Sequence, residues 1–181
     1  LSRKKTSEFK NNIEQITYNN FNDIFNYTKI LSSVEIVIHL AAYSNETNKI
    51  TNRQDFENIN INFLEKFLKE CNKFKIKKFI FISSSKIYGE YNTNDQAFNI
   101  NSNENPQNHY SQSKLIGEKI VKKYCKLYKI NYLIIRMPMV YGNQNNKNFR
   151  LLEKYVRYHL PIPLRNFTNT KSVLHIENFC E

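Results

Sequence analysis

The chain has 181 residues, 40% of them hydrophobic and 14% aromatic, which excludes a disordered chain and predicts a globular fold with a sizeable core. Its net charge of +11 suits a nucleic acid, a membrane surface or an anionic small molecule, but the lysines are scattered among asparagines and isoleucines, which is typical of a solvated surface. The sequence has neither a long apolar run nor a signal-peptide pattern, so we expect no membrane span.

The first half of the chain predicts two strong strands with a helix between them. Residues 12–18 indicate a weak strand and residues 21–31 a helix. The run "VEIVIHLAA" (34–42) is continuously apolar, which is typical of a strand buried on both faces of a sheet. Apolar residues then recur at helical spacing over 56–74, and "IKKFIFISSS" (76–85) predicts a strand that runs directly into three serines.

The second half continues the alternation. Residues 110–129 predict a helix, and residues 130–142 a third buried strand. A polar stretch over 90–109 has the length of a functional loop, or of an asparagine-rich surface insertion. A helix over 149–159 ends at prolines, and 172–179 indicates one more strand. This order predicts the α/β class, with a parallel sheet covered by helices.

The cysteines indicate the cellular compartment, and the two chain ends indicate whether the sequence is a fragment. Cys71, Cys125 and Cys180 are far apart, which predicts neither a zinc site nor a disulfide framework and favours a reducing, cytoplasmic compartment. The chain begins at Leu1 rather than at methionine and stops abruptly at Glu181. We therefore interpret it as a fragment of a longer chain.

Small and polar residues follow each of the main predicted strands. Ligands of open parallel sheets bind beyond the carboxyl ends of the strands, so these residues are the first candidates for a site. Ala41 and Ala42 end the first strand and let a flat ligand approach the backbone, while the second strand ends in three hydroxyls. Each end alone is equally compatible with helix packing or turn capping, but their joint placement favours a site.

Tyr110 and Lys114 lie in the helix that follows the serines. Their i, i+4 spacing places them on one helical face, although a chain with 12 tyrosines and many lysines produces such a pair by chance. A nearby ammonium favours the phenolate of a tyrosine, whose usual pKa is about 10, and such a tyrosine can exchange a proton with a sugar hydroxyl. We predict a proton-transfer pair assisted by a serine from the neighbouring strand end.

Five segments together resemble one family. They are "VIHLAA", "FISSSKIYGE" with its Ser-Ser-x-x-x-Tyr-Gly pattern, "NPQNHYSQSKLIGE" with Tyr-x-x-x-Lys, "IIRMPMVYG" and "KSVLHIENFCE". In this order they are similar to the extended short-chain dehydrogenase/reductases, specifically the NAD-dependent epimerase/dehydratase family that acts on nucleotide sugars. The resemblance implies an incomplete Rossmann-type, doubly wound parallel sheet, with a truncated dinucleotide-binding domain at 1–142 and the start of a substrate-binding region at 143–181.

The resemblance also implies roles for individual residues. Tyr110 is the expected acid/base, Lys114 holds the nicotinamide ribose and lowers the pKa of the tyrosine, and Ser84 is the catalytic serine, with Ser83 and Ser85 as its competitors. The expected cofactor is NAD or NADP, and the residues expected to bind it are Leu40, Ala41, Ala42, Asn60, Tyr110, Lys114 and Pro138.

The tail of the chain narrows the expected substrate. Residues 148–178 resemble bacterial enzymes that epimerise or reduce C4 of UDP-linked acetamido sugars. A nucleotide sugar, a UDP-hexose or UDP-acetamidohexose, is therefore the expected partner, with Lys171 offered to its diphosphate. The residues expected to contact it are Ser84, Asn148, Phe149 and Lys171. Relatives pair through helices like 56–74 and 110–129, so by analogy a homodimer is an open alternative.

Three alternatives stay open. The same residues serve a 4-epimerase and a 4-ketoreductase. The three glycines, Gly89, Gly117 and Gly142, form no glycine-rich loop, and "LSRKK" resembles the end of a second strand, so the first strand and helix of the family are expected to be missing. A non-catalytic remnant that cannot hold NAD tightly is the second reading. The third is a basic RNA-binding protein, which rests on charge alone.

Overall fold

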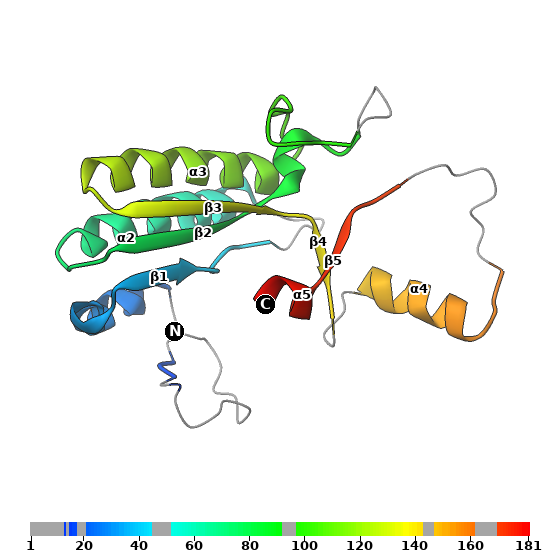
Figure 1. The fold of residues 1–181 in the computed structure, drawn as a ribbon, viewed down its shortest axis with the longest axis horizontal. Helices are drawn as coiled ribbons and strands as arrows, with labels where there is room; N and C mark the ends of the chain where they lie inside the picture. The colour runs from blue at the N-terminus through cyan, green and yellow to red at the C-terminus, as the bar shows by residue number, and fades with distance from the viewer. Residues whose placement is uncertain are drawn as a thin grey trace. The chain divides into compact units, whose positions relative to one another are not determined.

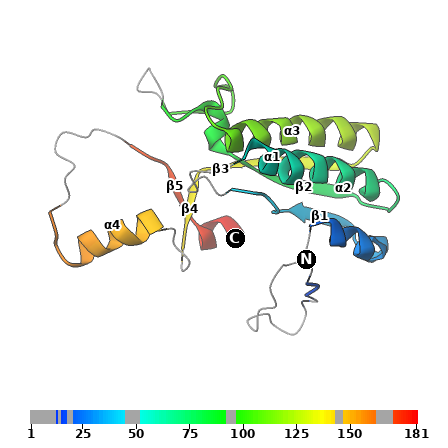
Figure 2. The same cartoon turned by 180° about the vertical axis from the view of Figure 1, so that it is seen from behind.

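The computed structural model describes residues 13, 15–17, 21–44, 52–91, 97–142, 147–161 and 170–181. The chain divides into two compact units, Leu1–Arg136 and Met137–Glu181, and each is described by itself. Figures 1 and 2 show their elements from opposite sides.

A three-stranded sheet forms the centre of the first unit. Its strands are β1 (Ile36–His39), β2 (Lys78–Ser84) and β3 (Asn131–Met137), in that spatial order. β1 and β2 are parallel, with His39 opposite Phe81. Parallel strands need a crossover connection, and the connections on both sides of β2 are helical. The predicted α/β class is confirmed.

The helices between the strands form one layer. α1 (Arg53–Phe56), the π-helical η2 (Glu57–Phe63) and α2 (Leu64–Cys71) follow one another between β1 and β2. The short 3₁₀ helix η3 (Ser85–Tyr88) and α3 (His109–Leu127) lie between β2 and β3. α2 packs on α3 and α3 packs on β2, and both views show the two helices side by side on one face of the sheet (Figures 1 and 2).

A capping box determines where α3 begins. The Asn108 side chain accepts a hydrogen bond from the Ser111 N–H at 2.8 Å, and the Ser111 hydroxyl accepts one from the Asn108 N–H at 3.2 Å. The box satisfies backbone donors that otherwise have no partner in the first turn of a helix. It thereby places Tyr110 at the start of α3.

The hydrophobic core lies between the helical layer and one face of the sheet. Alternate residues of β2, Phe79 and Phe81, point into it, as period-two strands require. The helices contribute apolar side chains at helical spacing. The buried members of this cluster are Ile24, Val37, Phe63, Leu64, Phe67, Leu68, Cys71, Ile76, Phe79, Phe81, Val121, Tyr124, Cys125 and Ile130.

The other face of the sheet differs from the prediction. Val37 and His39 are buried, but Ile36, Ile38 and Leu40 are 53%, 58% and 68% exposed. The prediction of a first strand buried on both faces is therefore wrong for the described part of the chain. The reason is that α2 and α3 both lie on the same side of the sheet.

The segment before β1 is helical but more tightly wound than predicted. The helix expected over 21–31 is the 3₁₀ helix η1 (Phe21–Ser33). Of the weak strand expected over 12–18, only residues 13 and 15–17 are described, and Thr17 makes a single β-bridge.

The second unit holds a small parallel pair, β4 (Met139–Tyr141) with β5 (Val173–His175). The strand predicted over 130–142 is divided into β3 and β4 at Pro138, since proline has no N–H to donate to a ladder. α4 (Lys147–Arg157) matches the helix predicted over 149–159. The strand predicted over 172–179 is wrong beyond His175, because α5 (Ile176–Cys180) begins there.

Candidate active site

Lys114 is buried where α3 meets the end of β2. Its side chain is 3% exposed, and its ammonium donates a hydrogen bond of 2.7 Å to the Ile82 carbonyl. The ammonium lies 5.9 Å from the centroid of the Tyr110 ring and 5.0 Å from that of Phe81. The structure thus brings the predicted tyrosine–lysine pair together at the carboxyl end of a central strand.

Burial makes this ammonium easier to deprotonate. Removal from water lowers the pKa of Lys114 to about 8, and the negative charge of Glu118, one turn further along α3, acts in the opposite direction. Lys114 therefore remains a cation at neutral pH inside a largely dry environment. A charge in such surroundings acts more strongly on its neighbours than one in water.

Tyr110 is half-buried and has a second cation near its ring. The Lys86 ammonium, from η3, lies 6.0 Å from the ring centroid, almost the same distance as that of Lys114. Lys86 could not be singled out from the sequence, because it is one lysine among many. Only the turn formed by η3 brings it over the tyrosine.

The three serines at the end of β2 have different environments. The Ser83 hydroxyl is buried and donates a hydrogen bond of 2.6 Å to the Glu118 carboxylate. The Ser84 hydroxyl accepts a hydrogen bond of 3.3 Å from the Lys86 N–H and so caps η3. Ser85 lies inside η3 and is half-buried. Ser83 is thus engaged with a carboxylate, while Ser84 stands at the junction of strand and helix.

Asn60 holds the end of the first strand against the helices. Its side-chain oxygen accepts a hydrogen bond of 2.7 Å from the Tyr43 N–H, and its amide nitrogen donates to the Tyr43 carbonyl at 3.0 Å and to the Ser113 hydroxyl at 2.8 Å. Both amide hydrogens of the 4%-exposed side chain are therefore used within the protein. Asn60 fixes the backbone next to Ala41 and Ala42, both of which are half-buried.

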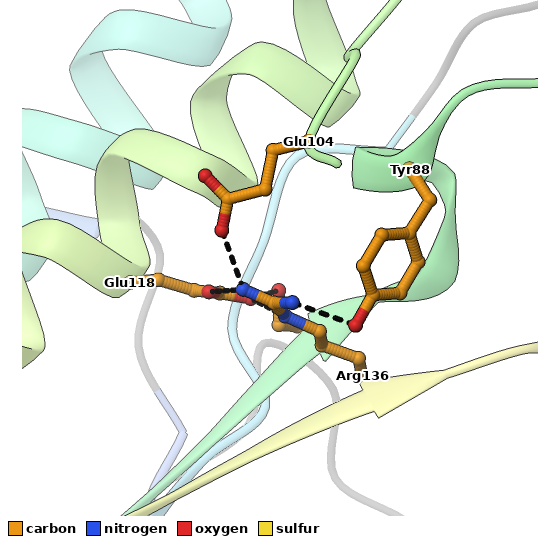
Figure 3. A network of polar contacts seen from close by, with 5 residues as sticks. Tyr88, Glu104, Glu118 and Arg136 are labelled. Carbon is orange, nitrogen blue, oxygen red and sulfur yellow. Dashed lines mark hydrogen bonds and ion pairs between the residues drawn. The ribbon is translucent and has the colours of Figure 1, made fainter. Parts of the chain in front are cut away.

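An ion pair between the buried Glu118 and the half-buried Arg136 is the centre of a polar network (Figure 3). Glu118, 1% exposed, accepts hydrogen bonds from Arg136 at 2.9 and 2.6 Å, in addition to the one from Ser83. Arg136 also donates to the Tyr88 hydroxyl at 2.7 Å and to the Glu104 carboxylate at 2.8 Å. None of these residues was among the predicted site residues, although Glu118 continues the i, i+4 spacing of Tyr110 and Lys114 and Arg136 is a charge within an apolar strand.

The remaining predicted residues belong to other parts of the chain. Leu40 follows β1 and is exposed. Pro138, Asn148, Phe149 and Lys171 all belong to the second unit. Asn148 and Phe149 lie in α4, but their side chains are outside the described residues, whereas Lys171 is exposed just before β5.

The helices and the ionisable side chains of the described residues bear on two other features, a membrane span and a metal site. None of its helices combines the length and the apolar character that crossing a bilayer requires. Within the same residues, no three His, Cys, Asp or Glu side chains gather as a metal site would need.

Sequence comparison identifies the family. The profile of the NAD dependent epimerase/dehydratase family matches residues 1–179. The chain belongs to this family. The predicted resemblance is confirmed, and the expected nicotinamide cofactor agrees with the family's dependence on NAD.

Two relatives of the chain are named for reactions of nucleotide sugars. A dTDP-D-glucose 4,6-dehydratase of Dictyostelium discoideum is 36% identical over 118 residues, which are 60% of this chain and 27% of that protein. A UDP-glucuronic acid 4-epimerase from Bacillus cereus, solved with UDP-glucuronic acid and NAD, is 27% identical and superposes with a TM-score of 0.75 over 91% of this chain and 52% of that chain.

A further solved structure shares the fold with this chain at lower sequence identity. A UDP-N-acetylglucosamine 4-epimerase from Methanobrevibacter ruminantium has a TM-score of 0.72 and 24% identity, and this likeness shows the shared Rossmann-type fold. The chain covers 27% of the Dictyostelium dehydratase and 52% of the Bacillus epimerase, so it spans about a quarter to a half of the length of these relatives.

Proposed function

We propose that the intact protein is an NAD(P)-dependent nucleotide-sugar 4-epimerase or 4-ketoreductase that uses Ser84, Tyr110 and Lys114. One observation carries the proposal. The Lys114 ammonium is buried at the end of β2, lies 5.9 Å from the centroid of the Tyr110 ring and donates a hydrogen bond to the carbonyl of Ile82, two residues before Ser84. Ligands of open parallel sheets bind at such strand ends. Family membership supports a nucleotide sugar as the substrate class.

The residues of the first unit fit a nicotinamide nucleotide. The Lys114 ammonium has three N–H donors, of which one goes to the Ile82 carbonyl. The other N–H groups suit the oxygens of ribose hydroxyls, next to the phenol of Tyr110. Ala41 and Ala42 have side chains small enough for close approach of a ring to the backbone. We propose that they line the cofactor together with Leu40 and Pro138, and that Asn60 holds the backbone next to Ala41 and Ala42 in place. A bound nicotinamide supplies hydride transfer at the sugar carbon.

The chain's own residues manage the proton. When the C4 alcohol of the sugar is oxidised, Tyr110 takes the O4 proton while the C4 hydrogen leaves as hydride. When the 4-keto group is reduced, Tyr110 returns a proton to O4. Lys114 keeps a positive potential at the phenol, and the Ser84 hydroxyl orients the same oxygen by hydrogen bonding. An epimerase performs both steps on opposite faces of one sugar, and a ketoreductase performs only the second.

A panel of substrates tests the proposal. The intact protein is incubated with UDP-sugars, dTDP-glucose and 4-keto-sugars, while NAD(P)H absorbance is followed and products are identified by NMR. Interconversion of C4 epimers indicates an epimerase, consumption of NAD(P)H with a 4-keto-sugar indicates a ketoreductase, and loss of water indicates a dehydratase. Failure to bind NAD(P) or to turn over any of these sugars would favour the non-catalytic reading.

Substitution of the tyrosine tests the catalytic assignment. We expect Tyr110→Phe to lower kcat by roughly 10²- to 10⁴-fold, the usual contribution of a general acid/base, and to leave the Kd for NAD(P) within about threefold. Lys114→Ala should weaken both kcat and cofactor binding. Tyr128→Phe and the exposed Lys122→Ala, on or next to the same helix, are matched controls. Near-normal turnover in Tyr110→Phe would contradict the assignment.

A further inference from the structure

One guanidinium joins four segments of the chain around the candidate site. Arg136, in β3, donates to Glu118 of α3, to Tyr88 of η3 and to Glu104 in the segment before α3. Glu118 in turn accepts the hydroxyl of Ser83 at the end of β2. These contacts use four of the donor positions of a planar fork whose geometry is rigid (Figure 3).

Ser84 lies between two parts of this network. Its neighbour Ser83 is bound to Glu118, and four residues beyond it Tyr88 is bound to Arg136, whose guanidinium carbon is 4.9 Å from the tyrosine ring centroid. Between these two points, Ser84 accepts the Lys86 N–H. The backbone that carries the Ser84 hydroxyl is therefore held on both sides by the same ion pair.

The network also holds part of the segment that leads into α3. Glu104 bonds Arg136, the Asn105 N–H donates to the Ile87 carbonyl at 2.8 Å, and Phe98 stacks on Tyr88 with ring centroids 5.7 Å apart. This segment ends at the capping box that places Tyr110. The network thus contacts the segments that carry both the serine and the tyrosine of the candidate site.

We propose that Arg136 and Glu118 are positioning residues: together they hold Ser84 and the 97–108 segment in the arrangement that catalysis requires. The proposal rests on the proposed function for its catalytic part, but the clamp itself is a property of the described residues. An ion pair whose carboxylate is buried and whose guanidinium donates four hydrogen bonds has few alternative geometries, which makes it suitable for holding several segments at once.

Hydrogen exchange tests the clamp without any assay of activity. In the intact protein, Arg136→Lys keeps the charge and loses the fork. We expect the Lys86, Gly89 and Asn105 amides to exchange at least tenfold faster, while amides of α2 keep their rates. Arg53→Lys removes the fork of an exposed arginine that pairs with Glu57; it is the matched control and should change none of these amides.

A double-mutant cycle tests the link to catalysis. If Arg136 acts through Ser84, Arg136→Lys should lower the single-turnover rate about tenfold or more in the wild-type background but less than about threefold in the Ser84→Ala background, with KM little changed in both. If Arg136→Lys does not fold, Glu118→Gln replaces it, with Glu70→Gln, a half-buried carboxylate of α2 that pairs with the exposed Lys73, as its control. The kinetics of Glu118→Gln are measured at about pH 6, because Glu118 raises the pKa of Lys114 and the lysine must stay protonated without it.

Each result decides one part of the proposal. Unchanged exchange at the three amides would overturn the clamp. Faster exchange with an equal loss of rate in both backgrounds would overturn the positioning role and leave a purely structural one. If the wild-type protein turns over no nucleotide sugar, the proposed function fails, and the exchange comparison still decides by itself whether the clamp exists.

Discussion

Two basic side chains, Lys114 and His39, are buried near the carboxyl end of the sheet. His39 lies among aromatic rings, with centroids 6.2 Å from Phe63, 6.0 Å from Phe67 and 5.9 Å from Phe79. Burial, then repulsion by Lys114, lowers the pKa of His39 to about 3 despite a hydrogen bond to the Ala41 backbone. His39 is therefore neutral at physiological pH, and Lys114 is the cation of this pair.

This neutral histidine predicts acid sensitivity. Between pH 6.5 and about 3 the unfolded chain binds a proton at His39 that the folded chain does not, so the free energy of unfolding falls as the pH drops through this window. At pH 5 the loss from this group is about 2 kcal/mol, and above pH 6.5 its contribution is constant.

Urea unfolding at pH 7 and pH 5 checks this prediction. His39→Phe keeps an aromatic ring in the cluster and cannot be protonated, so its stability should fall less than that of the wild type over this range. Carboxylates titrate in both proteins, and the comparison therefore removes their contribution. An equal fall in the two proteins would contradict a buried neutral His39.

At the scale of the element, the approach of α3 to β2 depends on a glycine. A Cβ atom at Gly117 would lie 2.9 Å from the tip of the Phe81 ring and 3.3 Å from a methyl carbon of Leu64. Phe81 and Leu64 are both buried in the core, so neither can move away easily. Gly117 lies between Lys114 and Glu118 along α3, and the same close approach allows both to reach the end of β2.

Filling this contact should separate the helix from the strand. We expect Gly117→Val to lower the free energy of unfolding by about 2–3 kcal/mol through overpacking, which outweighs the usual benefit of removing a glycine from a helix. Lys119→Val, at an exposed position of α3, controls for the β-branched side chain and should have an effect of only a few tenths of a kcal/mol. Thermal or urea unfolding measures both, and equal stability of the two variants would contradict tight packing at Gly117.

At the scale of the whole molecule, the proposed chemistry is divided between two units. The proposed catalytic residues, among them Ser84, which is also expected to contact the substrate, lie in the first unit, whereas the other residues expected to contact the substrate, Asn148, Phe149 and Lys171, lie in the second. We retain as a proposal the division into a dinucleotide-binding domain over 1–142 and a substrate-binding region over 143–181. The net charge of +11 suits anionic ligands such as a sugar diphosphate, although it does not identify one.

This division predicts separate effects on substrate and cofactor. Lys171→Ala should raise the KM for a UDP-sugar about tenfold or more, the usual loss for a charge-assisted contact to a phosphate, and leave the Kd for NAD(P) unchanged. Lys154→Ala, an exposed lysine of the same unit, is the control. Steady-state kinetics and cofactor titration measure the two constants, and an equal effect of Lys171→Ala on both would contradict the assignment.

Patterns in the sequence were enough to predict the α/β class, the family and the Tyr110–Lys114 pair. These follow from local periodicity and short motifs, because residues i and i+4 share a helical face whatever surrounds the helix. The winding of η1, the break at Pro138 and the helix α5 were less well predicted, since short segments take their conformation from their neighbours.

The differences among the three serines, and the charges that support the site, could be seen only in the three-dimensional fold. Ser83, Ser84 and Ser85 are equivalent as letters, but Ser83 faces Glu118 while Ser84 caps η3. Lys86 approaches the ring of Tyr110. Arg136 contacts Glu118, which is 18 positions away in the sequence, and Glu104, which is 32 positions away. Hydrogen bonds and ion pairs act over a few ångströms of space, and it is the packing of α3 on β2 that turns distant positions of the chain into neighbours.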